Sequence, residues 1–388
     1  MATTTPNFGW TVPTSSDLVK NGAVAIETLG DSIDASLVDL KGGTTGQVLA
    51  KASNTDMDFT WSTASGGSNL FYAGKNKMIN GKFDIWQRGT SISLPNGSWT
   101  YGPDRFAAYS AFSAGTSTFS QQTFTAGAAP VAGYEAQYFS RVTCGSTATF
   151  FQIEQRLEDV RTFAGQTVTV SFWAKSSATP TVKVTTYQNF GTGGSSGVNT
   201  DGSNFALTSS WVRYTATLSM PSISGKTIGT SNALNVGLVH VSGGINSATI
   251  DTWGWQIEAG STATDFQTAT GTLQGELAAC QRYYFRNTGG ETYSHYGIGM
   301  SISTTFGYAL IHLPVTMRVK PTSVDFGNVG ITDDVNYQLA ASTLVINWGS
   351  PSAVQVSVGT AATQVQYRPC YLTNQNNTAG FIGFSAEL

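Results

Sequence analysis

Hydrophobic and polar residues alternate along much of the middle of the chain, between residues 79 and 268. In the clearest runs, residues 167–175, 212–220 and 234–238, every second residue is apolar. Alternation at a period of two is typical of strands that bury one face. Turns rich in Gly, Ser and Asn separate the runs, and no repeat of about 20–30 residues indicates a β-helix. The pattern therefore predicts an antiparallel β-sandwich.

Residues 14–41 follow a different period, with apolar or small residues at alternating intervals of four and three. The positions are Val19, Ala23, Ile26, Gly30, Ile33, Leu37 and Leu40. This spacing predicts a helix with a coiled-coil-like seam that joins copies of the chain. Ala23 and Gly30 weaken the seam, so we do not expect it to associate strongly by itself, and a helix packed on its own domain is the alternative. Residues 47–61 then predict a small hairpin, and the Gly/Ser stretch at residues 65–68 predicts a linker.

The C-terminal part combines one helical stretch with further strands. Leu273, Leu277, Cys280 and Tyr284 recur at helical spacing, and apolar β-type runs return between residues 298 and 388. The predicted organisation is an N-terminal segment at 1–65, a linker at 66–78, a sandwich at 79–268, a connecting helix at 269–286 and a sandwich-like β tip domain at 287–388. The predicted fold class is therefore mainly β.

The composition excludes several classes of function. Charged residues make up 11% of the 388 residues and the net charge is −3, without a basic cluster that could contact phosphates, so we expect no nucleic-acid partner. No apolar run reaches the length of a membrane span, so we expect no membrane insertion. Three widely spaced cysteines make neither a disulfide framework nor a zinc site.

Residues suited to catalysis are few. The chain has three histidines, which limits acid–base chemistry. Glycoside hydrolysis needs two carboxylates a few ångströms apart. The nearest candidates, Glu154, Glu158 and Asp159, occupy a stretch that a solvated strand and turn explain as well. We therefore expect no enzymatic activity.

Several sequence blocks resemble proteins of bacteriophage particles. Two blocks near the start resemble the N-terminal parts of phage tail fibres and related virion appendages. They are FGWTVPTSSDLVKNGAVAIETLGDSID (residues 8–34) and GGTTGQVLAKASNTDMDFTWS (42–62). Three blocks resemble the jelly-roll domain of phage tail proteins, which is itself similar to carbohydrate-binding modules. They are INGKFDIWQRG (79–89), VTVSFWAK (168–175) and DTWGWQIEAGSTATDFQ (251–267). LPVTMRVKPT (313–322) and the closing GFSAEL resemble tail-fibre C-terminal domains.

The resemblance implies a homotrimeric tail fibre that mediates host attachment. Its N-terminus would bind other virion proteins, and its receptor would be a host cell-surface polysaccharide. The protein would be made in the cytoplasm of the host bacterium and would lie on the virion, on the tail rather than the capsid surface. A head fibre or decoration protein with a structural role, and a polysaccharide-degrading tailspike, remain as alternatives.

Aromatic and amide side chains in two loop regions are the candidates for carbohydrate binding. They are Tyr187, Asn189, Phe190, Tyr293, His295 and Tyr296. Aromatic faces pack against sugar rings, and amides orient the hydroxyls. Ordinary surface loops are the alternative explanation in both regions. Trp253 and Trp255 share a strand face with Ile257 and are expected in the core.

The resemblance to carbohydrate-binding modules also implies a structural calcium ion, and no other cofactor. In those modules calcium often joins the opening motif, here residues 80–84, to the last strand. Asp84 and Asp251 are the matching carboxylates, although calcium takes six to eight oxygen ligands. Turn hydrogen bonds made by Asn80 and Asp84 are the alternative.

Overall fold

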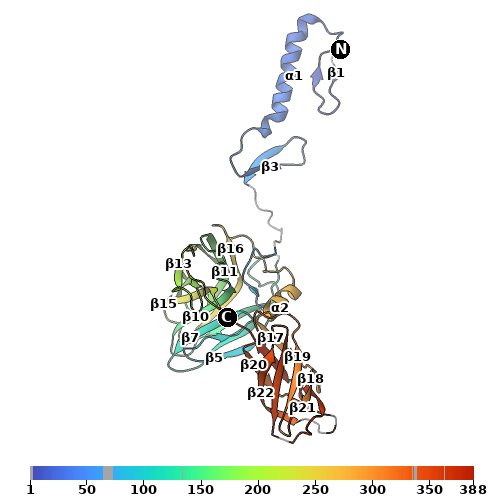
Figure 1. Cartoon of the computed structure of the whole chain (residues 1–388). Coiled ribbons are helices and arrows are strands. Elements are labelled where there is room, and N and C mark those ends of the chain that lie inside the picture. Colours follow the sequence, from blue (N-terminus) through green and yellow to red (C-terminus); the bar gives the residue numbers. More distant parts are fainter. Residues whose placement is uncertain (1–2, 64–72, 133, 334, 336–338, 362) are drawn as a thin grey trace. The chain divides into compact units, whose positions relative to one another are not determined.

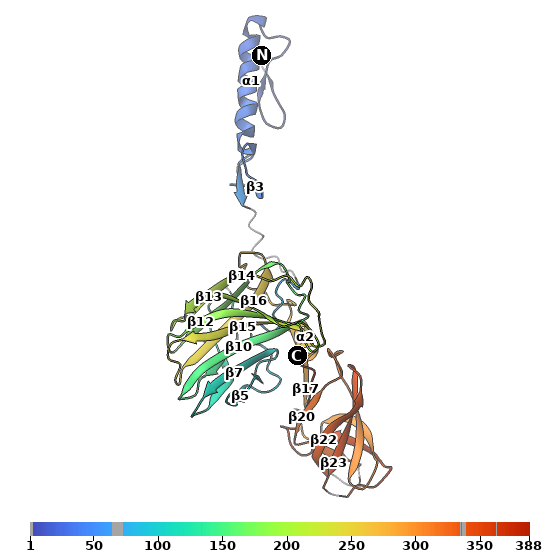
Figure 2. The same ribbon diagram turned by 60° about the vertical axis from the view of Figure 1, so that its left-hand side comes forward.

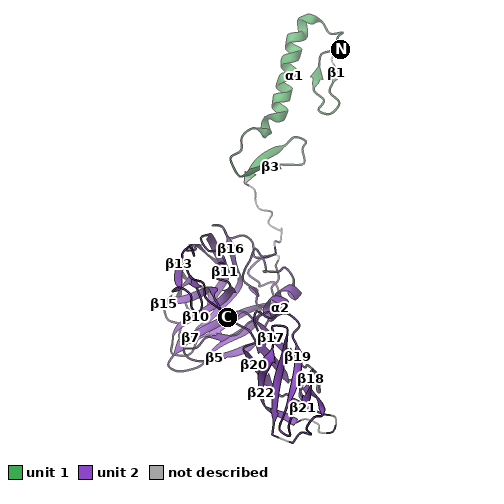
Figure 3. Ribbon diagram, in the orientation of Figure 1, with its two compact units in different colours: residues 1–70 green, residues 71–388 purple. Residues whose placement is uncertain are grey.

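The computed structural model describes residues 3–63, 73–132, 134–333, 335, 339–361 and 363–388 (Figure 1). The chain divides into two compact units, residues 1–70 and 71–388 (Figure 3). The predicted Gly/Ser linker at residues 65–68 lies outside the described residues. The predicted fold class, mainly β with one short N-terminal helix, is confirmed.

The first unit is built around one helix. A short hairpin of β1 (Thr3–Thr4) and β2 (Thr11–Val12) precedes α1 (Gly22–Leu37). One 3-10 turn lies directly before this helix, at Val19–Asn21, and one directly after it, at Val38–Leu40. Strands β3 (Gln47–Lys51) and β4 (Phe59–Thr63) then form the predicted hairpin. None of the residues of α1 is buried, because the helix contacts little besides the short hairpin.

The second unit begins with a sandwich of two six-stranded antiparallel sheets (Figure 2). The first sheet has the order β13 (Val198–Ala206), β12 (Thr181–Asn189), β15 (Ala233–Ser242), β10 (Ala148–Glu158), β7 (Phe106–Phe112) and β6 (Thr100–Tyr101). The second has the order β14 (Val212–Ser219), β11 (Thr167–Ser176), β16 (Thr249–Ala259), β9 (Tyr138–Thr143), β8 (Ser117–Thr123) and β5 (Ser91–Leu94). The chain passes repeatedly between the sheets, as in a jelly roll.

A β-bulge decides where the two tryptophans of β16 lie. Both are buried, as predicted, but the register of β16 against β11 shifts between Ser171 and Trp173, at Gly254. Trp255 therefore enters the core between the sheets and stacks on Phe172 at 4.5 Å. Trp253 joins an aromatic cluster on the opposite face of the second sheet. The expectation that both tryptophans share one face is wrong, because the extra residue of a bulge reverses the alternation.

The C-terminal domain is also β, as predicted. Helix α2 (Leu273–Gln281) ends before Tyr284, which the helical spacing had included. A three-stranded sheet follows, in the order β17 (Tyr284–Thr288), β25 (Phe381–Ser385) and β20 (Ser323–Gly327). Beside it, six strands close into a barrel, in the order β18 (His295–Ser301), β19 (Phe306–His312), β23 (Ala353–Thr360), β22 (Leu339–Gly349), β21 (Gly330–Thr332) and β24 (Pro369–Thr373).

A buried ionic network joins the sandwich to the C-terminal domain. Arg88 contacts Asp104 at 3.3 Å and Glu387 at 3.1 Å, and Arg105 also pairs with Glu387. The guanidinium of the buried Arg105 lies 3.5 Å from the centre of the Tyr283 ring. Buried charges are tolerated when they are paired in this way.

Candidate functional site

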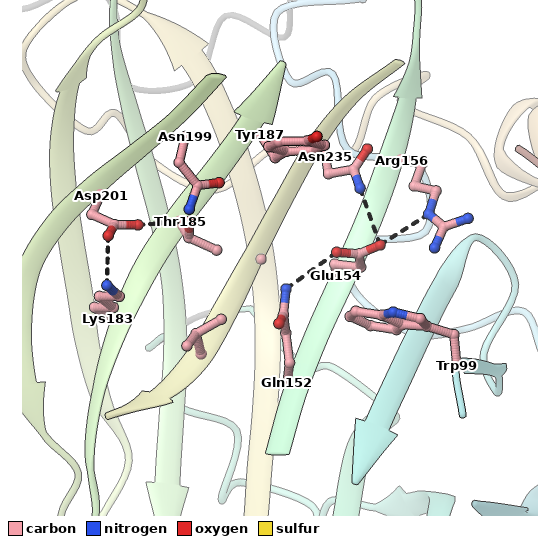
Figure 4. A pocket seen from close by; sticks show the side chains of 12 residues that line it. Trp99, Gln152, Glu154, Arg156, Lys183, Thr185, Tyr187, Asn199, Asp201 and Asn235 are labelled. Atoms are coloured by element: carbon pink, nitrogen blue, oxygen red, sulfur yellow. Dashed lines mark hydrogen bonds and ion pairs between the residues drawn. The ribbon is translucent and has the colours of Figure 1, made fainter. Parts of the chain in front are cut away.

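A cleft of about 380 Å³ lies on the outer face of the first sheet of the sandwich (Figure 4). Four neighbouring strands, β10, β15, β12 and β13, make its floor, and Trp99, which precedes β6, stands at one side. Successive side chains of a strand point to opposite faces, so alternate residues line the cleft and those between them enter the core. The lining side chains are therefore held on a backbone that the sheet makes rigid.

The strand register arranges the lining residues in three rows that cross the sheet. The rows are Arg156, Asn235, Tyr187 and Asn199; Glu154, Gly237, Thr185 and Asp201; and Gln152, Val239 and Lys183. Opposed residues on one face of a sheet lie about 5 Å apart. Polar groups consequently form nearly continuous lines across the cleft, with Tyr187 between two amides.

Glu154 is the centre of one hydrogen-bond network on the floor. Its Oε1 accepts from Arg156 Nε at 2.9 Å and from Asn235 Nδ2 at 3.2 Å, and its Oε2 accepts from Gln152 Nε2 at 3.2 Å. Burial raises the pKa of this carboxyl, and the three donors act against that shift. The network holds the side chains of three lining residues in defined orientations.

Asp201 is the centre of a second network, on the opposite side of the floor. It accepts hydrogen bonds from Lys183 Nζ at 2.5 Å and from Thr185 Oγ1 at 2.7 Å. Partial burial alone would raise the pKa of Asp201, but these two donors outweigh it and the pKa is lowered. The two networks give the cleft two cations and two carboxylates, so its charges balance.

Two glycines allow close approaches at the cleft. A Cβ atom on Gly237 would lie 2.5 Å from the carbonyl oxygen of Ile153 and 2.9 Å from Glu154 Cβ, so no larger residue fits in the middle row. A Cβ on Gly197 would lie 2.1 Å from the Tyr187 hydroxyl. The loop before β13 therefore packs closely on Tyr187 and supports its ring.

Two aromatic side chains remain accessible at the cleft. Trp99 is 39% exposed and Tyr187 37% exposed. Trp99 is supported by the Tyr109 ring, with 5.6 Å between ring centres, and Arg156 lies 5.8 Å from the Trp99 ring. Supported aromatic faces beside ordered amides, carboxylates and a hydroxyl can pack on a sugar ring while the polar groups hydrogen bond its hydroxyls.

One of the candidate carbohydrate-binding residues of the sandwich lies in this cleft and two do not. Tyr187 lines the cleft. Asn189 uses its Oδ1 to accept a hydrogen bond from Gly191 N at 2.9 Å, which shapes the turn after β12. Phe190 is buried, so the expectation that it offers a face to a sugar is corrected. The chain turns after Asn189 and directs the Phe190 ring inward.

The second candidate group, in the C-terminal domain, is not brought into the cleft. Tyr293 and His295 are exposed, and the His295 ring meets Tyr371 edge-on at 4.8 Å. Tyr296 is buried and donates a hydrogen bond to the Gly380 carbonyl at 2.6 Å, which corrects its assignment as a contact residue. The alternation of β18 turns Tyr296 into the barrel.

The two carboxylates expected at calcium each pair with a cationic side chain. Asp251 accepts from Arg141 Nε at 2.6 Å and Nη2 at 2.8 Å, and Asp84 lies 2.6 Å from Lys82 Nζ. Asn80 makes the turn hydrogen bonds of the alternative explanation, to Ile85 N and O. Among the described residues, no group of three or more His, Cys, Asp or Glu side chains is placed to hold a metal ion.

We expect that EGTA leaves the midpoint of thermal unfolding unchanged within about 1 °C, because arginine and lysine already neutralise both carboxylates. Calorimetry with 2 mM CaCl₂ against 5 mM EGTA measures this. A midpoint lower by several degrees in EGTA would contradict it, and Asp251→Asn would then show whether Asp251 is a ligand.

Most of the cleft residues were not identified from the sequence. Trp99, Gln152, Arg156, Lys183 and Asn235 carry no motif, and Glu154 was considered only as a candidate for hydrolysis. The available signal is the alternation itself, because each of these strand residues stands between two residues of the core. That signal marks an outward face but not which strands are neighbours.

The two antiparallel sheets place this part of the chain among jelly-roll β-sandwiches. The sequence matches no protein-family model and no curated protein. No described helix is long and apolar enough to cross a membrane.

Solved structures similar to the chain include two binding modules and a phage protein. A CBM4 module is 16% identical, with 47% of this chain and 98% of the module covered, at a TM-score of 0.29. The CBM22-1 xylan-binding domain from Paenibacillus barcinonensis Xyn10C is 13% identical, with 50% and 100% covered, at 0.30. The enzymatically active domain of bacteriophage CBA120 tailspike protein 4 is 13% identical, at 0.31. That match covers 48% of this chain and 21% of the tailspike chain.

Proposed function

We propose that this protein binds a polysaccharide in the cleft of its sandwich domain and acts as a homotrimeric fibre on a phage particle. The observation that carries the binding proposal is the cleft itself, where two supported aromatic faces stand beside ordered polar rows. The fibre proposal is supported by the sequence blocks at residues 8–34 and 42–62, which resemble the attachment ends of tail fibres.

The charge balance of the cleft favours a neutral polysaccharide. Lys183 and Arg156 each donate to a carboxylate of the same cleft. An anionic sugar would therefore meet cations that carboxylates already neutralise, whereas a neutral sugar needs only hydrogen bonds. Binding is tested by isothermal titration with soluble hexasaccharides of glucose, xylose, mannose and galactose, and with purified host polysaccharides. Failure of every one of these to bind would reject the proposal.

We also propose that the cleft binds without cleaving. Its carboxylates, Glu154 and Asp201, are opposed across three strand spacings, which puts their Cα atoms roughly 14 Å apart. Their side chains bind different cations, Arg156 for Glu154 and Lys183 for Asp201, whereas glycoside hydrolases direct two carboxyl groups, about 5–10 Å apart, at one glycosidic bond. Incubation with the bound polysaccharide should therefore release no reducing ends. Their release would favour the tailspike alternative.

Two separate apolar surfaces support self-association. On α1 and its flanking turns, six of the seven seam residues are exposed, among them Val19 at 95% and Ile26 at 65%. On the barrel, Ile298 is opposed to Leu310, Leu310 to Gln355, and Gln355 to Trp348, which makes one uncharged row across four strands. Soluble monomers rarely leave such surfaces uncovered.

Replacing Ile26 with Asp is expected to weaken the trimer at least tenfold, because three carboxylates would meet in the seam. Light scattering should show a shift from three chains towards the 40.9 kDa of one chain. Asp31→Lys is the control, since Asp31 is exposed outside the seam. A wild-type protein that is monomeric at micromolar concentration, or equal effects of both variants, would contradict the seam.

The virion location is tested on particles. Antibodies against residues 71–388 should label the phage tail in electron micrographs. Labelling of the head instead would favour the structural alternative, a head fibre or decoration protein.

A further inference from the structure

Residues 386–388 leave β25 and run against the sandwich, while the C-terminal domain holds their backbone. Ala386 N donates to the Tyr283 carbonyl at 2.7 Å. Arg318 donates from Nε to the Ala386 carbonyl at 3.0 Å and from Nη2 to the Glu387 carbonyl at 3.1 Å. The C-terminal domain therefore fixes the backbone of this segment.

The same three residues also contact the sandwich. The Glu387 carboxylate pairs with Arg88 and Arg105, as described above. The Leu388 carbonyl accepts from Arg156 Nη1 at 2.6 Å and from the Tyr101 hydroxyl at 3.3 Å. Arg105 donates through its other terminal nitrogen to the backbone carbonyl of Arg156. Two independent contacts thus lead from this segment to one residue, Arg156.

Arg156 is the residue through which the segment reaches the cleft. Its Nε donates to Glu154 Oε1 at 2.9 Å while its Nη1 donates to Leu388. A guanidinium is planar and rigid, so a change of partner at Nη1 turns Nε as well. Glu154 in turn orients Asn235 and Gln152, and the orientation of three lining residues therefore depends on the position of residues 386–388.

We propose that residues 386–388 are a positioning element for the cleft, so that ligand affinity is coupled to the docking of the C-terminal domain on the sandwich. This inference rests on the proposed function of the cleft. Coupling is reciprocal: if docking strengthens binding, the ligand strengthens docking by the same factor. A contact made by the C-terminal domain would then change the affinity of the cleft.

The test compares two carboxylates of the same junction. Glu387→Gln weakens the pairs that hold the segment on Arg105 and Arg88. Glu158→Gln is the matched control, because Glu158 also joins the sandwich to the C-terminal domain, through Arg282 at 2.9 Å and the Tyr283 hydroxyl at 2.9 Å. The segment is held by the backbone carbonyl of Tyr283, a different group, and the described contacts of Glu158 include neither Arg156 nor residues 386–388. Titration with the tightest hexasaccharide from the panel above should give a Kd about fivefold higher for Glu387→Gln and within twofold of wild type for Glu158→Gln.

Hydrogen exchange of the wild-type protein provides a second measurement that needs no variant. The same hexasaccharide should slow exchange at Ala386 N, which donates to Tyr283, and leave Ser301 N in the barrel unchanged. The coupling is overturned if Glu387→Gln and Glu158→Gln bind the hexasaccharide with the same Kd and exchange at Ala386 N is unaffected by it. This conclusion requires that wild type binds and that the double variant Trp99→Ala, Tyr187→Ala does not. If no hexasaccharide or polysaccharide binds wild type, the proposed function itself is rejected.

Discussion

Replacing both Trp99 and Tyr187 with alanine should lower the affinity for the polysaccharide roughly 100- to 1000-fold. These are the two aromatic faces that remain exposed in the cleft. Loss of a central aromatic contact typically costs about 2 kcal/mol. The two side chains stand on opposite sides of the floor, so their contributions should add to about 4 kcal/mol, and each 1.4 kcal/mol is a factor of ten. Isothermal titration of the single and double variants measures the loss.

Tyr293→Ala is the matched control for this prediction. Tyr293 is an exposed tyrosine of the same unit but lies outside the cleft, so its removal should leave the affinity unchanged within twofold. All variants should keep the wild-type melting temperature within about 2 °C, because exposed side chains contribute little to stability. A double variant that binds like wild type, or a Tyr293 variant that loses binding, would place the ligand elsewhere.

Replacing Arg105 with Met should reduce the free energy of unfolding of the second unit by about 3–5 kcal/mol. Arg105 is buried between Glu387 and the Tyr283 ring, and methionine preserves much of its volume without the charge. The Glu387 carboxylate would then keep Arg88 as its cation but lose its most buried partner. The midpoint of thermal unfolding should fall by roughly 5–8 °C, measured by calorimetry.

Arg161→Met is the control for this loss of stability. Arg161 pairs with Asp159 at 3.1 Å on the surface, where such pairs contribute about 0–1 kcal/mol. Its replacement should change the midpoint by no more than about 2 °C. Equal shifts for Arg105→Met and Arg161→Met would show that the network is energetically no more important than a surface pair.

Periodicity was sufficient for the fold class and insufficient for the bulge in β16. Alternation predicted the strands because most bury one face, and burial alternates in this way along β14 (Val212–Ser219) and at Val354–Val358 of β23. In the sequence, Trp253-Gly254-Trp255 follows the same alternation. In the structure Gly254 has a φ of +69° and the two tryptophan side chains point to opposite faces of the sheet. A bulge is decided by the pairing with β11, which no local period encodes.

The cleft could be predicted only in part, for a related reason. Outward polar residues alternate in β10 and β12, but they also alternate in β14, at Arg213, Thr215 and Thr217, which do not line this cleft. What differs is the strand order. Because β10 and β12 both pair with β15, Glu154 and Asn235 lie close together although more than 75 residues separate them in the sequence. The sequence indicates Tyr187 as a candidate because it precedes a glycine-rich loop. It gives no such signal for Trp99, which stands alone before a short strand.

The three cross-strand rows have a consequence for how this protein can diversify. Gln152, Thr185 and Asn199 stand on positions whose side chains the core does not need, while the main-chain ladder beneath them carries the sheet. If the cleft binds a polysaccharide as proposed, exchange of such residues should change which sugar binds at little cost in folding, whereas a Cβ at Gly237 would meet the Ile153 carbonyl oxygen at 2.5 Å. The proposed recognition surface can therefore change one side chain at a time while the sheet that carries it stays the same.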